Sequence, residues 1–455
     1  MSKVSAMSNS SLRELLRLAW PLMLAQIAIA LYDIADGYFL ARHSSAAMIA
    51  SLPARMVAGT LTTLFICSIG YVSTFIAQFH GGGDGRKALC YFAQGLWMAL
   101  FAAPVFLLLI PLSYFVVGLA GHSSAVDEAE RAYLLIAAPG GLFTLLNVVL
   151  SGFFAGQGRT RYISTCYILG CIANFFADWA LVPGTGPLPA FGITGAAMAT
   201  VIGNALTAAM LAVAVLRDGL FRRYACAQEF VPQPKRMWEV LRLGVPTGVT
   251  SFAASFAFMV FSLVLTGFDE MSTNAANALF RVNNIFYMAL CATSDSVLIL
   301  TGRCRGAGDD QGAYRAYGAG LRTIFIAQAL CFIVMFSFSG TIFDFFRPSD
   351  ATYDQSAYHC LGFILLCIMF LRELAEGVMC LTVGALRGVG DTKFVMCTQM
   401  TADLCLWMPF VLYIGKSGGS IIQLWLSMPI NMALIAIVLS LRWCGGKWRS
   451  KTLVS

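Results

Sequence analysis

The chain has 455 residues, of which 58% are hydrophobic and only 12% are charged. Soluble domains carry about 25% charged residues, so this composition indicates a membrane protein and excludes an ordinary soluble domain. The formal net charge of +7 comes without a basic stripe and stacking aromatics on a hydrophilic segment, and we therefore expect no nucleic-acid partner.

Twelve apolar runs follow one another along the chain, and each is long enough to cross a hydrocarbon core of about 30 Å. We expect all of them to be helices, because lipid offers no hydrogen-bond partners to open strand edges. The runs cover residues 14–40, 47–78, 88–113, 131–154, 161–183, 191–216, 240–267, 274–302, 316–340, 354–385, 394–414 and 420–442. The predicted fold class is an all-α polytopic membrane protein with twelve transmembrane helices.

The basic residues predict the orientation of these spans in the bilayer. Of the 30 Lys and Arg residues, 23 fall in segments on one side, and four fall on the other: Arg42, Arg131, Arg347 and Lys416. The positive-inside rule then places both termini in the cytoplasm. We expect a multi-pass protein of the plasma (inner) membrane.

The two halves of the chain repeat each other. Leu16-Arg17-Leu18 with Pro21 recurs as Leu241-Arg242-Leu243 with Pro246, and Gly81, Gly83 and Asp84 recur at the same offset of 225 as Gly306, Gly308 and Asp309. The segment from Gly156 to Arg161 recurs from Gly388 to Lys393, at an offset of 232. A repeat this long is a duplicated domain, and duplicated membrane proteins are typically transporters that bind their substrate between the halves.

The longest hydrophilic stretch separates the two repeats. We expect an N-terminal six-helix lobe at 1–216, a cytoplasmic linker at 217–239, a C-terminal six-helix lobe at 240–442 and a cytoplasmic tail at 443–455. Because six spans return the chain to the same side, both lobes enter the membrane in one direction, and a pseudo-two-fold axis along the membrane normal should relate them.

The sequence predicts no metal site, no cofactor and no enzymatic activity. None of the 14 cysteines has the two-residue spacing of a zinc or redox motif, and the four histidines are scattered. The glycine-rich turns at 81–85 and 306–310 lack the lysine and hydroxyl of a phosphate-binding loop. Uphill transport would therefore be driven by an ion gradient.

Seven acidic residues fall inside the predicted spans, where a central carboxylate costs about 2.5–3.5 kcal/mol. They are Asp33, Asp36, Asp178, Asp295, Glu373, Glu376 and Asp403. Such residues are expected to face a cavity and bind a cation or a proton. The alternative is that some of them lie near an interface or pair with an intramembrane arginine, for which Arg55, Arg281 and Arg372 are available.

Two pairs in the N-terminal lobe give the strongest signal. Asp33 and Asp36 are three residues apart in the first span, and Asn174 and Asp178 are four apart in the fifth, so each pair lies on one helix face. An amide oxygen and a carboxylate on neighbouring turns can both face one small cation, or form a proton-dependent hydrogen-bond network. Asp33 is a secondary candidate, as are Glu376, Asp295 and Asp403 in the C-terminal lobe. The duplication does not copy the acids, because Phe261 and Phe410 stand at the positions that repeat Asp36 and Asp178.

Several short motifs, in this order, resemble those of the multidrug and toxic compound extrusion (MATE) transporters over essentially the whole chain. They are Pro21 and Gln26 before Asp36, the stretch Ala77-Gln78-Phe79-His80-Gly81, the turn Gly156-Gln157-Gly158-Arg159-Thr160, the Asn174 and Asp178 pair, the stretch from Gly192 to Thr200, and the stretch from Leu386 to Thr392.

This resemblance implies a V-shaped pair of helical bundles that exchanges protons or sodium ions for organic cations. The family's N-lobe ion site maps onto Asp36, Asn174, Asp178 and Thr200, and all four residue types are present. The NorM-type branch adds a Glu on the seventh helix, where this chain has Ala254, and an acid on the tenth helix, which matches Glu376. Coupling through the N-lobe, as in the DinF-type branch, is therefore favoured.

The predicted function is a secondary active antiporter that exports cationic, amphipathic organic compounds in exchange for H⁺ or Na⁺ by alternating access. Its partners would be the small-molecule substrates, the coupling cation and the lipid bilayer, and we expect it to function as a monomer. The alternative is a flippase or exporter of a lipid-linked or anionic metabolite, which would need a large basic cavity.

Overall fold

The computed structural model describes residues 2–43, 54, 58–59, 62–118, 124–185, 187, 189–224, 227–265, 267–346 and 353–450. Nearly all of these residues are helical, and the described ranges contain no strand. Arg55 and the side chains of Asp33 and Arg281 lie outside the described part.

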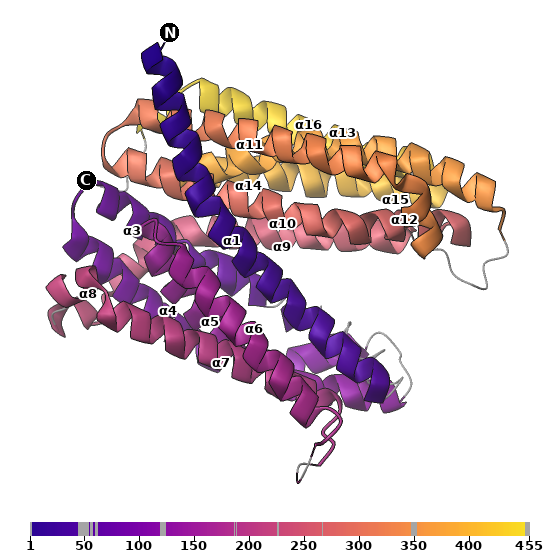
Figure 1. Cartoon of the computed structure of the whole chain (residues 1–455), viewed down its shortest axis with the longest axis horizontal. Coiled ribbons are helices and arrows are strands. Elements are labelled where there is room, and N and C mark those ends of the chain that lie inside the picture. The colour runs from indigo at the N-terminus through magenta and orange to yellow at the C-terminus, as the bar shows by residue number, and fades with distance from the viewer. Residues whose placement is uncertain are drawn as a thin grey trace.

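The first half of the chain forms one bundle (Figure 1). Its helices are α1 (Ser2–His43), a span over Thr62–Gly81 that ends in α3 (Val72–Gly81), α4 (Gly85–Gly118), α5 (Ser124–Gly156), α6 (Arg161–Leu181) and α7 (Ile193–Arg217). The short helices α8 (Gly219–Tyr224) and η1 (Ala227–Phe230) lead to the second half.

The second half forms the other bundle. It contains α9 (Pro234–Leu265), α10 (Glu270–Gly306), α11 (Asp310–Ser337), the short α12 (Ser339–Phe346), α13 (Gln355–Gly388), α14 (Thr392–Met400), the π-helical η2 (Thr401–Trp407), α15 (Met408–Ser417) and α16 (Ile421–Cys444), with a final turn η3 (Lys447–Ser450). Among the described residues, nine helices are long and apolar enough to cross a membrane, or ten with the bent α10. Together with α1 and α13 they give the twelve-helix, two-lobe arrangement.

One predicted span departs from a uniform helix. The run expected at 394–414 is α14, then a π-helical segment from Thr401 to Trp407, then α15. A π-helix is wider than an α-helix and is rarely longer than one turn. Asp403 lies inside this segment.

Among the described residues, the two lobes share a core at one end only. The end that carries α8, η1 and residues 231–233 is called the linker side here, and the opposite end the far side. The largest apolar cluster joins residues of both lobes, such as Phe75 and Val389. A second cluster contains only C-lobe residues around Trp425, and a third only N-lobe residues around Val182. Figure 1 accordingly shows the lobes meeting near the linker and diverging away from it.

A pair of glycines related by the repeat makes the contact on the linker side possible. A Cβ added to Gly81 would lie 2.2 Å from the carbonyl oxygen of Arg303, and one added to Gly306 would lie 1.8 Å from that of Gln78. Because Gln78 and Arg303 are themselves related by the repeat offset of 225, the crossing of α3 and α10 obeys the pseudo-two-fold relation. Only glycine permits backbones to approach this closely.

Two hydrogen bonds join the lobes beside this crossing. The Tyr71 hydroxyl donates to the Arg387 carbonyl at 2.6 Å, and Gln78 Nε2 donates to the Gly388 carbonyl at 2.7 Å. Both acceptors are at the end of α13, where the last carbonyls have no α-helical partner; the Arg387 carbonyl also accepts from the Gly390 N–H at 3.1 Å. The N-lobe therefore satisfies backbone groups of the C-lobe.

The linker packs against α4. Trp97 Nε1 donates to the Phe230 carbonyl at 2.7 Å, and Gln94 Oε1 accepts from the backbone N–H of Gln233 at 2.7 Å. An ion pair joins Arg86 of α4 to Glu229. These contacts fix the start of α9, and with it the beginning of the C-lobe.

Candidate functional site

Asp36 lies buried on α1, with only 2% of its surface exposed. The hydroxyl of Thr200 on α7 donates a hydrogen bond to Asp36 Oδ2 at 3.1 Å. A hydroxyl that donates to a carboxylate oxygen keeps its own lone pairs available to a proton or a cation. Two of the predicted site residues, 164 positions apart in the chain, are thus in direct contact.

Asn174 and Asp178 are fully buried on one face of α6, as their spacing predicts. Both polar atoms of the Asn174 amide lack a hydrogen-bond partner among the described residues. Buried amides are almost always hydrogen-bonded, so this group is available to a water molecule or a bound cation.

A close crossing of α6 and α7 shows how these residues come together with α1. A Cβ added to Gly203 of α7 would lie 2.8 Å from the Tyr32 ring and 2.9 Å from Asn174 Cβ. Going one helical turn from this level towards the far side leads from Tyr32 to Asp36 on α1, from Asn174 to Asp178 on α6, and from Gly203 to Thr200 on α7. The two carboxylates and the threonine therefore lie on the same level of the bundle.

Sequence reasoning missed Tyr32, Gly203 and Gly170. A Cβ on Gly170 would meet Thr207 Oγ1 at 1.9 Å and the Tyr32 hydroxyl at 2.8 Å, so Tyr32 fills the space that the two glycines leave. The available signal was its position four residues before Asp36, on the same helix face. Asp33, the remaining N-lobe candidate, lies on α1 with its side chain outside the described part.

In the C-lobe, the structure places two acids against an arginine. Arg372 Nη1 lies 2.6 Å from Glu373 Oε1, and Arg372 Nη2 lies 2.6 Å from Glu376 Oε2. All three residues are buried, and Asn283 Nδ2 also donates to Glu373 Oε1 at 2.9 Å. Buried charges need this kind of pairing because their desolvation is costly. Glu376, a secondary candidate, is therefore paired with an intramembrane arginine.

Asp403 and Asp295 have other partners. Asn431 Nδ2 donates to Asp403 Oδ1 at 2.7 Å, and both residues are buried. Asp295 on α10 is exposed and lies within electrostatic range of Arg387 on α13. In the described residues, no group of three or more His, Cys, Asp or Glu side chains could hold a metal ion. In the N-lobe, Asp36 of α1 and Thr200 of α7 are in direct contact, and Asp178 of α6 lies buried at the same level.

A family model for MatE matches residues 21–180 and 246–411, the bulk of both lobes. The chain belongs to the MatE family. Its relatives include a protein of Deinococcus radiodurans described as probable multidrug resistance protein NorM, which is 27% identical, with 95% of each chain covered. MatE proteins of this kind are multi-pass multidrug efflux transporters, and the chain accordingly has the twelve-helix, two-lobe MATE architecture.

Solved structures share this fold at lower sequence identity. One is described as the outward-facing conformation of a multidrug resistance MATE family transporter, with a TM-score of 0.84, 19% identity, and 96% and 97% of the two chains covered. Another, a transporter from Pyrococcus furiosus, has a TM-score of 0.84 and 18% identity, with 97% of each chain covered. That protein is described as having a binding pocket of reverse polarity, which suggests a different function for it. These matches establish the fold.

Proposed function

We propose that this MatE protein is a secondary antiporter that exports cationic, amphipathic organic compounds in exchange for protons or sodium ions. The observation that carries the proposal is the contact between buried Asp36 of α1 and Thr200 of α7, with Asp178 of α6 buried at the same level of the N-lobe. An intramembrane acid is costly and is retained mainly where it binds an ion or a proton. The unsatisfied amide of Asn174 adds a further ligand one turn away.

The C-lobe acids support coupling through the N-lobe. Arg372 pairs with both Glu373 and Glu376, so a positive charge already occupies the place where a cation would bind. Asp403 has a neutral partner, Asn431, and among the described residues no acid from another helix contacts it. We therefore assign the coupling ion to Asp36 and Asp178, with Asn174 and Thr200 as further ligands.

The proposed orientation follows from the basic residues and from the contact between the lobes. The linker side would be cytoplasmic, as the positive-inside rule predicts, so that the lobes meet on the cytoplasmic side and diverge towards the outside. Release of the cation from the N-lobe would then alternate with opening of the lobe contact on the linker side. The protein would act as a monomer.

Transport by reconstituted protein tests the proposal. Liposomes would be loaded with a fluorescent organic cation and given either a pH gradient or a sodium gradient, with wild type, Asp178→Asn and Asp403→Asn compared. We expect one of the two gradients to drive wild-type transport, Asp178→Asn to abolish it, and Asp403→Asn to retain it. Asp403→Asn is the matched control, because it makes the same change at another buried acid. Transport of anionic or lipid-linked compounds in place of cations would overturn the substrate assignment.

A further inference from the structure

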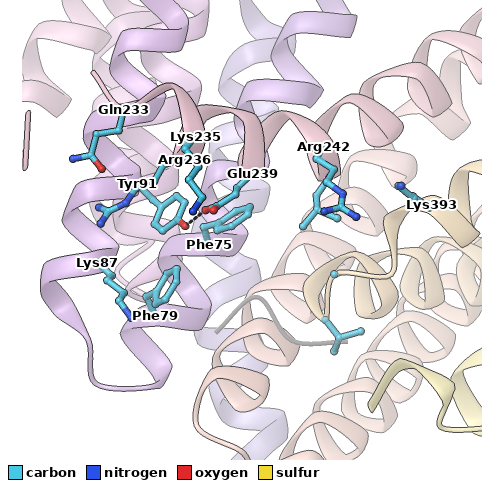
Figure 2. A pocket seen from close by; sticks show the side chains of 13 residues that line it. Phe75, Phe79, Lys87, Tyr91, Gln233, Lys235, Arg236, Glu239, Arg242 and Lys393 are labelled. Carbon is cyan, nitrogen blue, oxygen red and sulfur yellow. Dashed lines mark hydrogen bonds between the residues drawn. The ribbon is translucent and has the colours of Figure 1, made fainter. Parts of the chain in front are cut away.

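A pocket of about 790 Å³ lies on the linker side, between the two lobes (Figure 2). The N-lobe contributes Phe75 and Phe79 of α3 and Tyr91 of α4, whose rings stack at centroid distances of 4.7 Å and 5.1 Å. The C-lobe contributes α9 and the turn that leads from α13 to α14. The pocket thus has an aromatic wall from the N-lobe and is lined by both lobes.

The charges around this pocket are almost all positive. Five cationic side chains face one carboxylate, Glu239, which gives the lining a formal net charge of +4. The cations are Lys87, Lys235, Arg236, Arg242 and Lys393. Like charges repel one another, and an anion in the pocket would offset this repulsion.

Part of this charge is compensated within the protein. Lys87 Nζ lies 3.5 Å from Asp84 Oδ2, and Arg236 Nη1 lies 4.0 Å from Glu229 Oε2. Glu239 accepts a hydrogen bond from the Tyr91 hydroxyl. In contrast, Lys235, Arg242 and Lys393 form no hydrogen bond or ion pair with any described residue. Figure 2 shows Arg242 and Lys393 at one side of the pocket and Lys87 with the aromatic rings at the other.

The repeat predicts a counterpart of this pocket on the other side of the α3–α10 crossing. Arg17 and Arg161 are the repeat counterparts of Arg242 and Lys393, at offsets of 225 and 232. There Arg303 stands at the position that repeats Gln78. Its Nη1 lies 3.3 Å from Glu14 Oε1, and 2.9 Å from where a Cβ on Gly158 would lie. One side of the α3–α10 crossing therefore holds an arginine–glutamate pair, whereas the side that holds Gln78 keeps an open basic pocket.

We propose that this pocket binds a phosphate-bearing anion, and that the bound anion holds the two lobes together on the linker side. A phosphate group presents several acceptor oxygens and a double charge, which suit Lys and Arg donors. Three helices begin beside the pocket, with Lys87 in the first turn of α4, Lys235 in that of α9 and Lys393 in that of α14. Their positive N-terminal ends favour an anion and disfavour unpaired cations.

The effect on conformation follows from the lining. Lys87 belongs to the N-lobe, whereas Arg242 and Lys393 belong to the C-lobe, so an anion between them contacts both. When the lobes separate on this side, the anion loses one set of cations. A ligand with differential affinity shifts the equilibrium towards the state that it binds better. The phosphate can come from the headgroup of an anionic lipid or from a soluble phosphorylated compound, because both offer the same chemistry. The inference does not depend on which ion drives transport.

Binding can be tested on the full chain in nanodiscs of phosphatidylcholine, titrated with inorganic pyrophosphate. The readouts are the melting temperature and amide hydrogen exchange at the ends of α3 and α10. The double variant Arg242→Gln/Lys393→Gln removes two of the three uncompensated pocket cations. The control, Arg17→Gln/Arg161→Gln, makes the matching change on the other side of the α3–α10 crossing. We expect pyrophosphate to raise the melting temperature of wild type and control. The pocket variant should need at least about tenfold more pyrophosphate for the same shift, because it lacks two charge-assisted contacts. Potassium chloride at matched ionic strength controls for screening.

A second arm distinguishes the two sources of phosphate. The same proteins are compared in nanodiscs with and without phosphatidylglycerol, in the absence of pyrophosphate. A response to pyrophosphate that the pocket variant loses supports a soluble ligand, and a response to phosphatidylglycerol alone that the pocket variant loses supports a lipid headgroup. If neither probe stabilises the wild type, or if the pocket and control variants respond equally, the proposal is wrong.

Discussion

Replacing Gly306 with alanine should open the lobe contact on the linker side. The new Cβ would lie 1.8 Å from the Gln78 carbonyl oxygen, 2.6 Å from its carbonyl carbon and 2.8 Å from its Cα. All three atoms belong to backbone, so no side chain can turn away to make room. The clash is relieved only when α10 moves away from α3, which separates the lobes at this point.

The structure sets the size of this movement. Real Cβ atoms essentially never approach other heavy atoms closer than 3.0 Å, so the Gln78 oxygen must recede by at least about 1.2 Å, the difference between 3.0 Å and 1.8 Å. The same displacement would stretch the inter-lobe hydrogen bonds from Tyr71 and Gln78, now 2.6 Å and 2.7 Å, beyond hydrogen-bond reach. Each such bond contributes about 0.5–1.5 kcal/mol. We therefore expect Gly306→Ala to weaken lobe closure by about 1–3 kcal/mol, or roughly 5- to 150-fold in population.

Amide hydrogen exchange measures this effect. Exchange at the ends of α3 and α10 should be faster in Gly306→Ala than in wild type, in proportion to the population of the open state. Gly318→Ala is the control, because Gly318 lies within α11 and a Cβ there meets nothing within 4 Å. If the two variants exchange at the same rate at both helix ends, the glycine crossing does not hold the lobes together.

Three further substitutions test the described contacts. Arg372→Gln removes the partner of Glu373 and Glu376 and should destabilise the protein by about 3–5 kcal/mol, seen as a lower melting temperature; an unchanged melting temperature would show that the triad is not a structural ion pair. Gly203→Ala should reduce organic-cation transport at least about tenfold, because its Cβ displaces Asn174 from a contact at 2.9 Å, whereas Gly219→Ala meets nothing within 4 Å and should transport normally. Thr200→Val removes the hydroxyl that donates to Asp36 at 3.1 Å and should weaken the transport response to the driving ion, while Thr200→Ser should preserve it.

The fold could be predicted from the sequence because membrane helices are evident from composition. In lipid, an apolar run must satisfy the hydrogen bonds of its own backbone, so its length alone predicts a helix. The repeat at an offset of 225 predicts two lobes that enter the membrane in the same direction. The π-helical segment at Thr401–Trp407 could not be predicted, because its apolar pattern is that of an ordinary helix. Gly81 and Gly306 were recognised as a repeat, but their role in the lobe contact depends on neighbours in the opposite half of the chain.

For the candidate site, too, patterns within one helix could be predicted, whereas contacts between helices could not. Spacing within one helix correctly predicted that Asn174 and Asp178 share a buried face. The contact of Thr200 with Asp36 came from the family resemblance, since no local pattern joins residues on α1 and α7. For Glu376 the sequence left two interpretations open, and only the structure shows that Arg372 reaches it.

The basic pocket could not be predicted from the sequence. Arg242 and Lys393 were counted among the cationic residues that set the orientation, a property that depends only on the side of the membrane. Their convergence with Lys87 requires the lobes to be placed against each other. The signal available beforehand was the difference between Gln78 and Arg303, which occupy matching positions of the repeat. One side of the α3–α10 crossing therefore lacks an arginine.

The central claim is that Asp36 and Asp178 exchange the coupling cation for substrate, and an equilibrium measurement tests it most directly. The dissociation constant of an organic cation would be measured at several pH values and sodium concentrations for wild type, Asp178→Asn and Asp403→Asn. By reciprocal linkage, the coupling ion must weaken substrate binding if the substrate drives the ion off its site. We predict that one of the two ions raises the dissociation constant in wild type and Asp403→Asn but leaves it unchanged in Asp178→Asn. The same ion dependence in Asp178→Asn as in wild type would contradict the N-lobe coupling site.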